Sequence, residues 1–412
     1  MVEAITLIIL THILYLVSVF LVLKFRAGGQ PKISLRFVIC TAILFRLTAW
    51  PLYPALSDDA YRYRWEGKLQ AAGGDPYQTR PIDARWTEIR DETFPRVGSK
   101  DFKSIYGPLV ELSERLTYHL LNKFTKNPFV QVCWFKLPGA LFDLGILWAL
   151  VLLLRQHSLP STLVLIYAWS PLPVMEFWAT GHNDSIDIFF ILLALLMAAR
   201  RRWIWAFGWL SLAVAAKIWP ILLFPAFILS PAGGKPRWWQ WLVLLPVAAL
   251  PAAPYFGDIT ENAQFISGFV GGWRNNDSLF GAILWISGGD LYRAKYTAFA
   301  ITGVITIVFA LFVRSLEKAV LWTIVAVLLV SANCHPWYLT WFAPLLVFYP
   351  YTPLLLWNAL MPLSYAVLIR WLNLDEWDGS TPLRWLVFAP FFACALISSS
   401  IRMGSHWLRQ RR

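Results

Sequence analysis

The chain has 412 residues, of which 58% are hydrophobic and only 15% charged, and its formal net charge is +12. About a quarter of the residues in an ordinary globular protein are charged, so this composition excludes a typical soluble fold and indicates an integral membrane protein. The basic residues form short clusters between apolar blocks instead of a stripe interleaved with aromatic residues, so we expect no nucleic-acid partner.

The first two apolar blocks run over about residues 4–23 and 37–55, close to the roughly 20-residue length of a membrane-crossing helix. Glu3, and no basic residue, precedes the first block, so we expect a retained span instead of a signal peptide. Because Lys and Arg mark cytoplasmic loops, the basic turn between the blocks places the N-terminus outside. Residues 56–128 then form a long first extracytoplasmic loop.

The remaining apolar blocks complete the predicted bundle. Spans are expected at about 130–154, 161–178, 186–199, twice within 203–229, and at 238–254, 291–313, 319–332, 337–350, 353–371 and 383–401. The block 203–229 is too long for one span and has Lys217 and Pro220 at its middle, so two short spans meet outside there; this block and 279–289 also fit re-entrant segments. The sequence therefore predicts one domain, residues 1–412, an all-α polytopic bundle of about 13 transmembrane helices with a cytoplasmic C-terminus.

Cysteine and histidine patterns indicate neither a disulfide framework nor a metal site. Three of the four Cys residues fall inside apolar blocks, and only Cys334 lies near a block end. His335 has no partner at the spacing of a known metal motif, and the chain lacks Walker, GxGxxG and GxSxG motifs. We therefore expect no cofactor, with a divalent metal left open.

Polar residues at the outward ends of the predicted spans form four groups: Asp58 and Asp59; His182, Asn183 and Asp184; Lys217; and the turn from Asn333 to Tyr338. A lysine in an apolar segment is costly, so function is the default hypothesis for Lys217, with snorkelling as the alternative. Asp184 and Asp187 would suit the first turn of the next span as helix caps. Lys136 and Asp143 share a helix face and, with Arg46, indicate interhelical pairs.

The stretch SDDAYRYRWEGKLQAAGGDPY, residues 57–77, predicts a helix lying on the membrane surface. One apolar stripe recurs at three- and four-residue spacing: Tyr61, Trp65, Leu69 and Ala72. Gly73 and Gly74 then end the helix. In a structural interpretation Ser57 caps the helix and Asp58 pairs with Arg62. In a functional one, a carboxylate serves as general base at the membrane interface.

These motifs resemble one known family. The string DDAYRYRWEGKLQAAGGDPY, with IYGPL (Ile105 to Leu109) following it, is similar to the first outer loop of GT-C superfamily glycosyltransferases, above all the bacterial polyprenyl-phosphate-mannose-dependent mannosyltransferases. The GHNDS turn, the segment from Lys217 to Pro220 and the turn from His335 to Tyr338 are similar to further signatures of that family. Three residues depart from its usual pattern and bear on the choice of sugar: Glu66, Asp75 and Gly107.

The resemblance implies transfer of a sugar, by the family's habit mannose, from a polyprenyl-phosphate carrier to a hydroxyl of a lipid-linked or glycan acceptor. The site would lie on the extracytoplasmic face of the cytoplasmic membrane, with the carrier tail between spans. It implies Asp58 as the general base, with Asp59 second, and Lys217, Arg62 or Arg64 at the donor phosphate. The sugar and acceptor pocket would contain Trp65, Tyr77, Tyr106, His182, Asn183, Asp184, His335, Trp337 and Tyr338. One alternative is a multi-pass lipid or sugar transporter with substrate sites at the embedded charges. Another is a non-catalytic scaffold of an envelope or glycan assembly complex, in which Asp58 would be dispensable.

Overall fold

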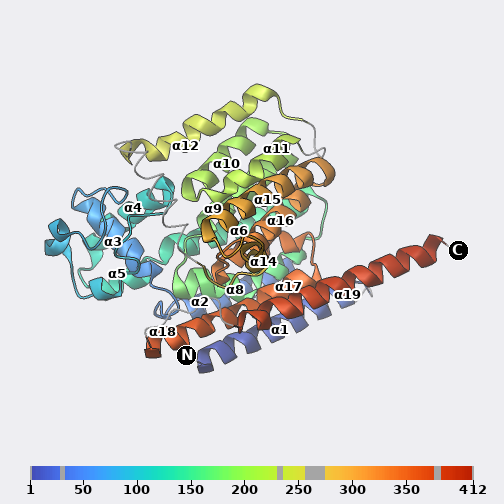
Figure 1. Ribbon diagram of the computed structural model, residues 1–412, viewed down its shortest axis with the longest axis horizontal. Helices are drawn as coiled ribbons and strands as arrows, with labels where there is room; N and C mark the ends of the chain where they lie inside the picture. Colours follow the sequence, from blue (N-terminus) through green and yellow to red (C-terminus); the bar gives the residue numbers. More distant parts are fainter. Residues whose placement is uncertain (1, 28–32, 230–234, 256–273, 375–381, 411–412) are drawn as a thin grey trace.

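The computed structural model describes residues 2–27, 33–229, 235–255, 274–374 and 382–410. In these residues the regular structure is helical, apart from one isolated β-bridge between Asn275 and Asn333. The all-α fold expected from the apolar blocks is therefore confirmed. Figure 1 shows a body of packed helices with a smaller lobe at one side, formed by the first loop.

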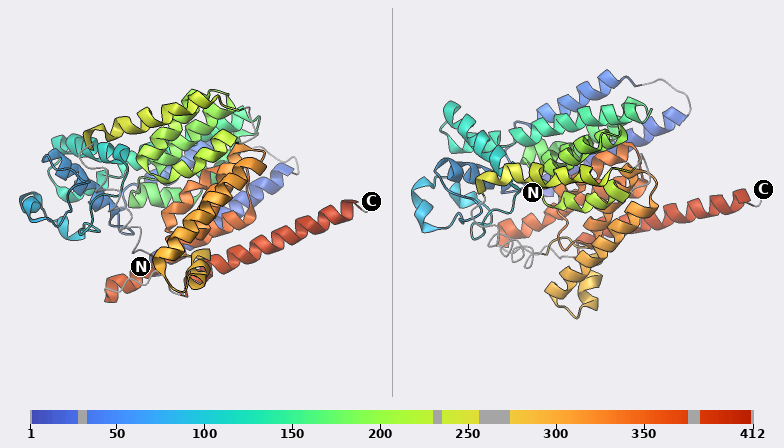
Figure 2. Two further views of the ribbon diagram at one scale, coloured as in Figure 1. Left: turned by 45° about the horizontal axis from the view of Figure 1, so that its top comes forward. Right: turned by 90° about the horizontal axis from the view of Figure 1, so that it is seen from above.

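The body is built from the helices of the apolar blocks. Its first part contains α1 (Val2–Ala27), α2 (Leu35–Ala49), α6 (Leu137–Gln156), α9 (Ser185–Ala199), α10 (Trp203–Ala216), α11 (Phe224–Leu229) and α12 (Leu244–Ala252). Its second part contains α14 (Leu279–Ile286), α15 (Leu291–Phe312), α16 (Leu316–Val330), α17 (Thr352–Leu360), α18 (Val367–Leu374) and α19 (Arg384–Gln410). Short 3₁₀ helices extend some of these: η5 (Trp219–Leu223), η6 (Trp238–Val243), η7 (Ala253–Tyr255) and η10 (Met361–Ala366). The central helix α9 packs against both α6 and α10, and α19 extends beyond the body (Figure 2).

Helix length and apolar composition make the chain a multi-pass membrane protein. Four of the described helical segments are long and apolar enough to cross a bilayer: Val2–Lys24, Pro128–Gln156, Leu291–Phe312 and Thr352–Trp371. Shorter apolar helices lie at Ser185–Ala199, Trp203–Ala216, Trp219–Leu229 and Arg384–Ser400. The count of thirteen spans stays a prediction.

Several of the expected spans in the described residues are not single continuous α-helices, and two of them have prolines at the interruptions. The span expected at 161–178 consists of η3 (Ser161–Val164), α7 (Leu165–Ala168), α8 (Pro171–Pro173) and the π-helix η4 (Val174–Thr180). The span expected at 337–350 consists of the 3₁₀ helices η8 (Pro336–Trp341) and η9 (Ala343–Val347). Proline lacks a backbone N–H and clashes with the preceding turn, so the prolines in both segments interrupt the helical hydrogen bonds.

The predicted break at Lys217 is confirmed. Helix α10 ends at Ala216, Lys217 adopts an extended backbone (φ −146°, ψ 143°), and η5 begins at Trp219 with Pro220 in its first turn. The polar side chain and the proline thus divide one long apolar block into two helices, with Lys217 at the point where they meet.

The prediction that the first helix of the loop lies on the membrane surface is wrong. Helix α3 (Asp59–Ala71) does not present its apolar stripe at a membrane surface, because α4 (Pro108–Phe124), α5 (Pro128–Trp134), η1 (Ala84–Ile89) and η2 (Phe94–Arg96) pack around it. Trp65 is only 2% exposed and Leu69 is fully buried, whereas Ala72 is exposed. The helix does end as predicted, with Gly73 at φ 85°. An apolar stripe looks the same in sequence whether it faces lipid or protein.

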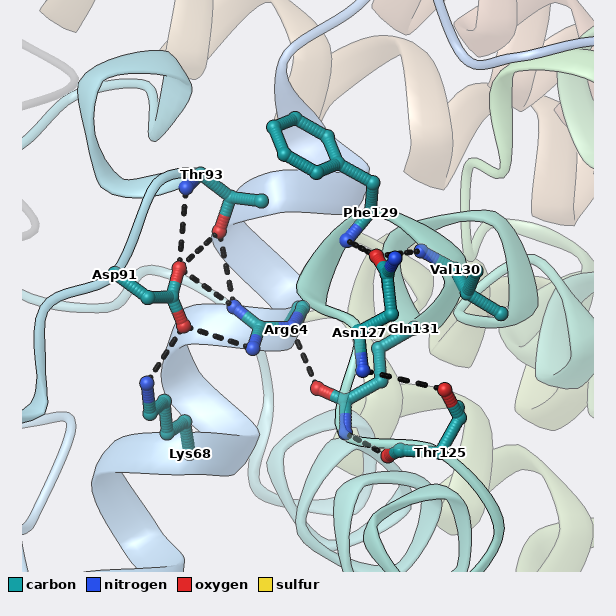
Figure 3. A network of polar contacts seen from close by, with 9 residues as sticks. All are labelled: Arg64, Lys68, Asp91, Thr93, Thr125, Asn127, Phe129, Val130 and Gln131. Carbon is teal, nitrogen blue, oxygen red and sulfur yellow. Dashed lines mark hydrogen bonds and ion pairs between the residues drawn. The ribbon is translucent and has the colours of Figure 1, made fainter.

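A polar network ties α3 to the rest of the lobe (Figure 3). The Arg64 guanidinium donates to Asp91 at 2.9 Å, to Thr93 Oγ1 at 2.9 Å and to Gln131 Oε1 at 2.8 Å, and Lys68 also donates to Asp91. Because all three nitrogens of Arg64 are engaged, this residue crosslinks the lobe and is not placed to bind a phosphate.

A buried ion pair joins α2 to α6. Arg46 Nε lies 2.6 Å from Asp143 Oδ2, and both side chains are fully buried. Tyr167 Oη and Trp178 Nε1 donate to the same carboxylate at 2.6 and 2.8 Å. The expected interhelical pairing of Arg46 and Asp143 is therefore found.

Lys136 does not share this pair. Its Nζ donates to the carbonyl oxygens of Trp50 and Leu52 at 2.6 and 2.7 Å, at the end of α2. The sequence spacing of Lys136 and Asp143 suggested a shared face, but Lys136 lies before the first turn of α6 and turns toward α2 instead.

The Arg46→Met variant is expected to lower the free energy of unfolding by about 3–5 kcal/mol, because it leaves Asp143 buried without its charge partner. Thermal unfolding of the detergent-solubilised protein measures the loss. The double variant Arg46→Met/Asp143→Asn should regain part of it, and Leu47→Met, on the exposed face of α2, should have no effect. Unchanged stability of Arg46→Met would contradict the importance of this pair.

Candidate active site

The four polar groups predicted at outward ends come together between the lobe and the body. Asp59 Oδ2 lies 3.5 Å from His182 Nε2, and the His182 ring stacks on Trp337 with centroids 4.1 Å apart. Lys217 Nζ lies 2.6 Å from Asp184 Oδ1 in the turn that also carries His182. Residues far apart in sequence thus form one cluster.

Asp58 lines a small pocket at the edge of this cluster, together with Arg62, Gly98 and Tyr106. It occupies the N-cap position of α3, but its side chain makes no capping hydrogen bond; Ser57 Oγ accepts from the Asp59 N–H at 3.2 Å. Asp58 is exposed to solvent, yet partial desolvation by the surrounding lobe and then the charge of Asp59 raise the pKa of Asp58 to about 6. A carboxyl that titrates near neutrality and makes no capping bond suits proton transfer.

The expected pair between Asp58 and Arg62 does not form. Arg62 Nε donates to Glu66 one turn later, and its terminal nitrogens donate to the carbonyl oxygens of Ser99 and Phe102 at 2.8 and 2.9 Å. Asp58 is the N-cap of α3 with a non-helical backbone (φ −92°, ψ 0°), and it contacts Arg62 through its carbonyl oxygen, which accepts from the Arg62 N–H at 3.2 Å. Arg62 therefore fixes the segment that surrounds the pocket.

Asp59 lies beside the buried ring of His182, whose other ring nitrogen contacts the carboxylate of Glu176. His182 Nδ1 lies 2.9 Å from Glu176 Oε2, and Tyr365 Oη donates to both Glu176 oxygens at 2.9 and 3.0 Å. Burial lowers the pKa of His182, but the hydrogen bond to Glu176 and the nearby carboxylates outweigh it, so the pKa is raised overall. Tyr63 Oη donates to Asp59 at 3.3 Å. The imidazole is thus held by Glu176 on one side and lies near the Asp59 carboxylate on the other, at 3.5 Å and without a hydrogen bond.

Glu176 and Tyr365 were not among the residues predicted from the sequence. Glu176 carries a signal that could have identified it, because a carboxylate inside an apolar block is costly and often functional. It also lies in the π-helix η4, a feature frequent at functional sites. Tyr365 gives no such signal, since tyrosines are common near the ends of membrane helices.

The turn before α9 does not use its carboxylates as caps. Asp184 makes no capping hydrogen bond; its Oδ1 accepts from Lys217 and, at 2.7 Å, from Trp341 Nε1. Asp187 Oδ2 accepts from Trp219 Nε1 at 2.9 Å. These contacts fix the turn against η5 and η8.

Asn183, in the same turn, has an unsatisfied side-chain amide. It is only 5% exposed, and neither its Oδ1 nor its Nδ2 has a hydrogen-bond partner among the described residues. An unpaired buried polar group costs about 1–3 kcal/mol, so this amide is available to water or to a polar ligand.

Trp337 does not offer a free face for stacking on a sugar. Its ring lies between His182 and His335, with centroid distances of 4.1 and 4.4 Å and interplanar angles of 18° and 13°. His335 Nδ1 lies 2.9 Å from Asn275 Nδ2, and burial lowers the pKa of His335 to about 3. The Tyr338 ring stacks on Trp341. This aromatic stack forms a wall of the cluster.

Trp65 and Tyr77 lie in the interior of the lobe, away from the polar cluster. Trp65 packs on Phe94, with centroids 4.9 Å apart, and Tyr77 donates to the Tyr106 carbonyl at 2.7 Å while its ring packs on Tyr255. Tyr106 itself lines the Asp58 pocket. Of the aromatic residues predicted for sugar contact in the first loop, Tyr106 alone has this position.

Gly107 allows the lobe to approach the break at Lys217. Its N–H donates to the Ala216 carbonyl at 3.0 Å, and a Cβ at this position would lie 2.3 Å from the Ala215 oxygen. A larger residue would therefore push the lobe away from the body.

Metal binding has no support from the arrangement of side chains. In the part of the chain that the structure describes, no group of three or more His, Cys, Asp and Glu side chains is placed to hold a metal ion. The expectation of no bound cofactor, with a divalent metal left open, stays a prediction.

Comparison with known protein families gives a match. A family model described as "Alpha-(1->6)-mannopyranosyltransferase, N-terminal domain" matches residues 1–233. That range contains Asp58, Asp59, the turn at His182, and Lys217, but not the turn at His335. No curated protein and no solved structure matches the chain.

Proposed function

The chain belongs to the alpha-(1→6)-mannopyranosyltransferase family, and we propose that it transfers mannose from a polyprenyl phosphate to a hydroxyl of a lipid-linked or glycan acceptor. Family membership confirms the resemblance read from the sequence and makes the protein a membrane mannosyltransferase. The donor, the acceptor, the extracytoplasmic orientation and a bundle of about 13 spans belong to the proposal.

The carboxylate of Asp58 is the observation that carries the proposed mechanism. It lines a pocket, makes no capping bond, and has its pKa raised to about 6 by burial and by Asp59. The acceptor oxygen attacks C1 of mannose, Asp58 takes the hydroxyl proton, and the C1–O bond to phosphate breaks. The leaving group is the polyprenyl phosphate, and the configuration at C1 inverts. Asp59, held by Tyr63 and facing His182, positions this first turn of α3.

Lys217 is proposed to stabilise the phosphate as it leaves. Its ammonium group lies at the break between α10 and η5 and is anchored by Asp184, with 16% of the side chain exposed. A preorganised cation in a site of low dielectric constant is most effective where negative charge develops in the transition state. Asn183, with its unpaired amide, is proposed to bind sugar hydroxyls.

The rate of transfer is expected to rise with pH and to level off above about pH 6. Asp58 accepts a proton only when it is ionised, so below its pKa of about 6 the kcat/KM should fall roughly tenfold per pH unit. A pH profile of initial rates with subsaturating donor tests this. A profile that is flat from pH 5 to pH 7 would exclude Asp58 as the base.

The Gly98→Ala variant is expected to lower the transfer rate roughly 100-fold, because small displacements of a catalytic group have effects of this size. A Cβ at Gly98 would lie 2.0 Å from Asp58 Oδ2, so the carboxylate must move. Gly208→Ala in α10, where the new methyl meets no atom within 4 Å, is the matched control. Equal rates for both variants would show that the position of Asp58 does not matter.

A transfer assay with purified protein tests the proposed donor. Radiolabelled mannose on a polyprenyl phosphate should appear on the acceptor, whereas a nucleotide-linked mannose should give no product. Product from the nucleotide donor alone would overturn the proposal. The transporter alternative is weakened because Arg46, Asp143 and Lys136 are satisfied within the protein and leave no charge to bind a substrate.

A further inference from the structure

Glu176, a buried residue that the mechanism above does not use, lies against the ring of His182. Both belong to one wide turn at the end of the π-helix η4, in which the N–H groups of Gly181 and His182 donate to the Glu176 carbonyl oxygen at 3.0 and 2.8 Å. Gly181 has φ 88°, and a Cβ on it would lie 2.7 Å from Lys136 Cγ. This turn therefore brings the side chain of His182 next to that of Glu176.

Hydrogen bonds assign a proton to Nδ1 of His182. This nitrogen lies 2.9 Å from Glu176 Oε2 and 3.1 Å from Thr180 Oγ1. Both oxygens of Glu176 accept from Tyr365 Oη, and the hydroxyl of Thr180 donates to the Glu176 carbonyl oxygen at 2.8 Å. Both neighbours of Nδ1 are thus acceptors, so Nδ1 is the donor.

The second ring nitrogen of His182 faces Asp59. Nε2 has no hydrogen-bond partner among the described residues, and Asp59 Oδ2 lies 3.5 Å from it. Trp337 covers one face of the fully buried ring. Burial lowers the pKa of His182, but Glu176 and then Asp59 and Asp184 raise it by more. A ring between two carboxylates is therefore favoured in its doubly protonated, positively charged form.

The other cations around this turn are held by groups of their own. Lys217 is paired with Asp184, and Arg62 is paired with Glu66. Lys136 donates to two backbone carbonyl oxygens at the end of α2. These contacts fix the three cations in place and leave the position next to Asp59 to the ring of His182.

The remaining titratable neighbours carry no positive charge at neutral pH. Burial lowers the pKa of His335 to about 3, so this ring, on the other face of Trp337, is neutral. The titratable groups that also face Asp59 are Asp58, Tyr63, Tyr106, Glu114, Tyr338 and Tyr365. His182 is therefore the cation placed beside Asp59.

We propose that Glu176 is a positioning residue that holds His182 as an imidazolium beside Asp59, so that Asp59 stays a carboxylate and Asp58 takes the proton of the attacking hydroxyl. This inference rests on the function proposed above. A fixed cation on one side makes two adjacent carboxylates unequal. Partial desolvation and then the charge of Asp59 raise the pKa of Asp58 to about 6, whereas the charge of His182 lowers it.

The pH profile of transfer tests the role of Glu176. Glu176→Gln removes the counter-ion of His182, and loss of the positive charge raises the pKa of the nearby carboxylates. The acid limb of kcat/KM should therefore move up by about one pH unit. Transfer should be roughly tenfold slower than in the wild-type protein at pH 5 and equal to it above pH 8. Glu176→Asp, which keeps the charge, should keep the wild-type profile.

Glu317→Gln is the matched control, because Glu317 also pairs with a histidine, His157, at 2.8 Å. His157 follows the last residue of α6, whose 20 residues place it about 30 Å from Lys136 and the turn at Gly181. Glu317→Gln should leave the acid limb unchanged. An unshifted acid limb in Glu176→Gln, or a loss of rate that is equal at every pH, would refute the proposed role of Glu176.

Nitrogen NMR of the substrate-free protein tests the charge of His182 without any transfer of sugar. The chain has six His residues, so ¹⁵N-labelled histidine gives few ring signals, and His182→Gln identifies the one that is lost. We expect both ring nitrogens of His182 to be protonated at pH 7 in the wild-type protein and only one in Glu176→Gln. A neutral His182 in the wild-type protein at pH 7 would overturn the proposal, even if Glu176→Gln did not fold. Failure of the wild-type protein to use any lipid donor would refute the proposed function instead, and the NMR result would still decide the charge of His182.

Discussion

The Asp58→Asn variant is expected to transfer mannose roughly 100- to 10,000-fold more slowly than the wild-type protein, with little change in donor binding. Asparagine keeps the shape of the side chain but cannot accept the proton of the attacking hydroxyl. Initial rates with saturating polyprenyl-phosphate mannose measure the loss. Asp101→Asn, on an exposed residue of the same lobe, is the control and should retain full activity.

Asp59→Asn separates the two neighbouring carboxylates. Asp59 contacts Tyr63 and faces His182, so its loss should disturb the position of the first turn of α3 and lower the rate less than the loss of Asp58. An inactive Asp59→Asn beside a fully active Asp58→Asn would assign the base to Asp59. Wild-type rates for both variants would remove the general base from the mechanism.

The Lys217→Gln variant is expected to lower kcat roughly 100- to 1,000-fold, because the departing phosphate loses a preorganised cation. The same change also leaves the buried Asp184 carboxylate without its ion-pair partner, which destabilises the protein. Rate and thermal stability must therefore be measured on the same preparations. Lys217→Arg should keep part of the activity, since it keeps the charge.

The double variant Lys217→Gln/Asp184→Asn distinguishes catalysis from folding. Neutralising both partners should restore most of the thermal stability, because Asp184 is then no longer a buried charge without its ion-pair partner. Transfer should stay low, since the cation is still missing. Recovery of the transfer rate together with stability would show that Lys217 has only a structural role.

The sequence predicted those features that depend on local patterns. Apolar length and basic flanks located most helices, and a lysine next to a proline located the break at Lys217. Polar residues at the predicted outward ends also proved to lie together, as His182 and its contacts with Asp59 and Trp337 show. Local sequence patterns suffice to locate helices and their breaks, because a membrane-crossing segment must be a helix of a certain length.

The features that sequence reasoning missed depend on contacts between distant segments. Arg64 is engaged by Asp91 and Gln131, which stand 27 and 67 residues away, and this removes it from any phosphate site. Glu176 is held by Tyr365, 189 residues away. Nothing in the local sequence shows that both faces of Trp337 are covered. The residue types suggested candidates for the site. The tertiary packing determines which of these side chains still have a polar atom or a ring face free to contact a ligand.

The configuration of the newly formed glycosidic bond tests the central claim most directly. Purified protein is supplied with mannose β-linked to polyprenyl phosphate, and the one-bond carbon–proton coupling at C1 of the product is measured by NMR. Direct displacement assisted by Asp58 predicts an α-linked mannose, in agreement with the family to which the chain belongs. A β-linked product would require two successive displacements and would contradict the mechanism.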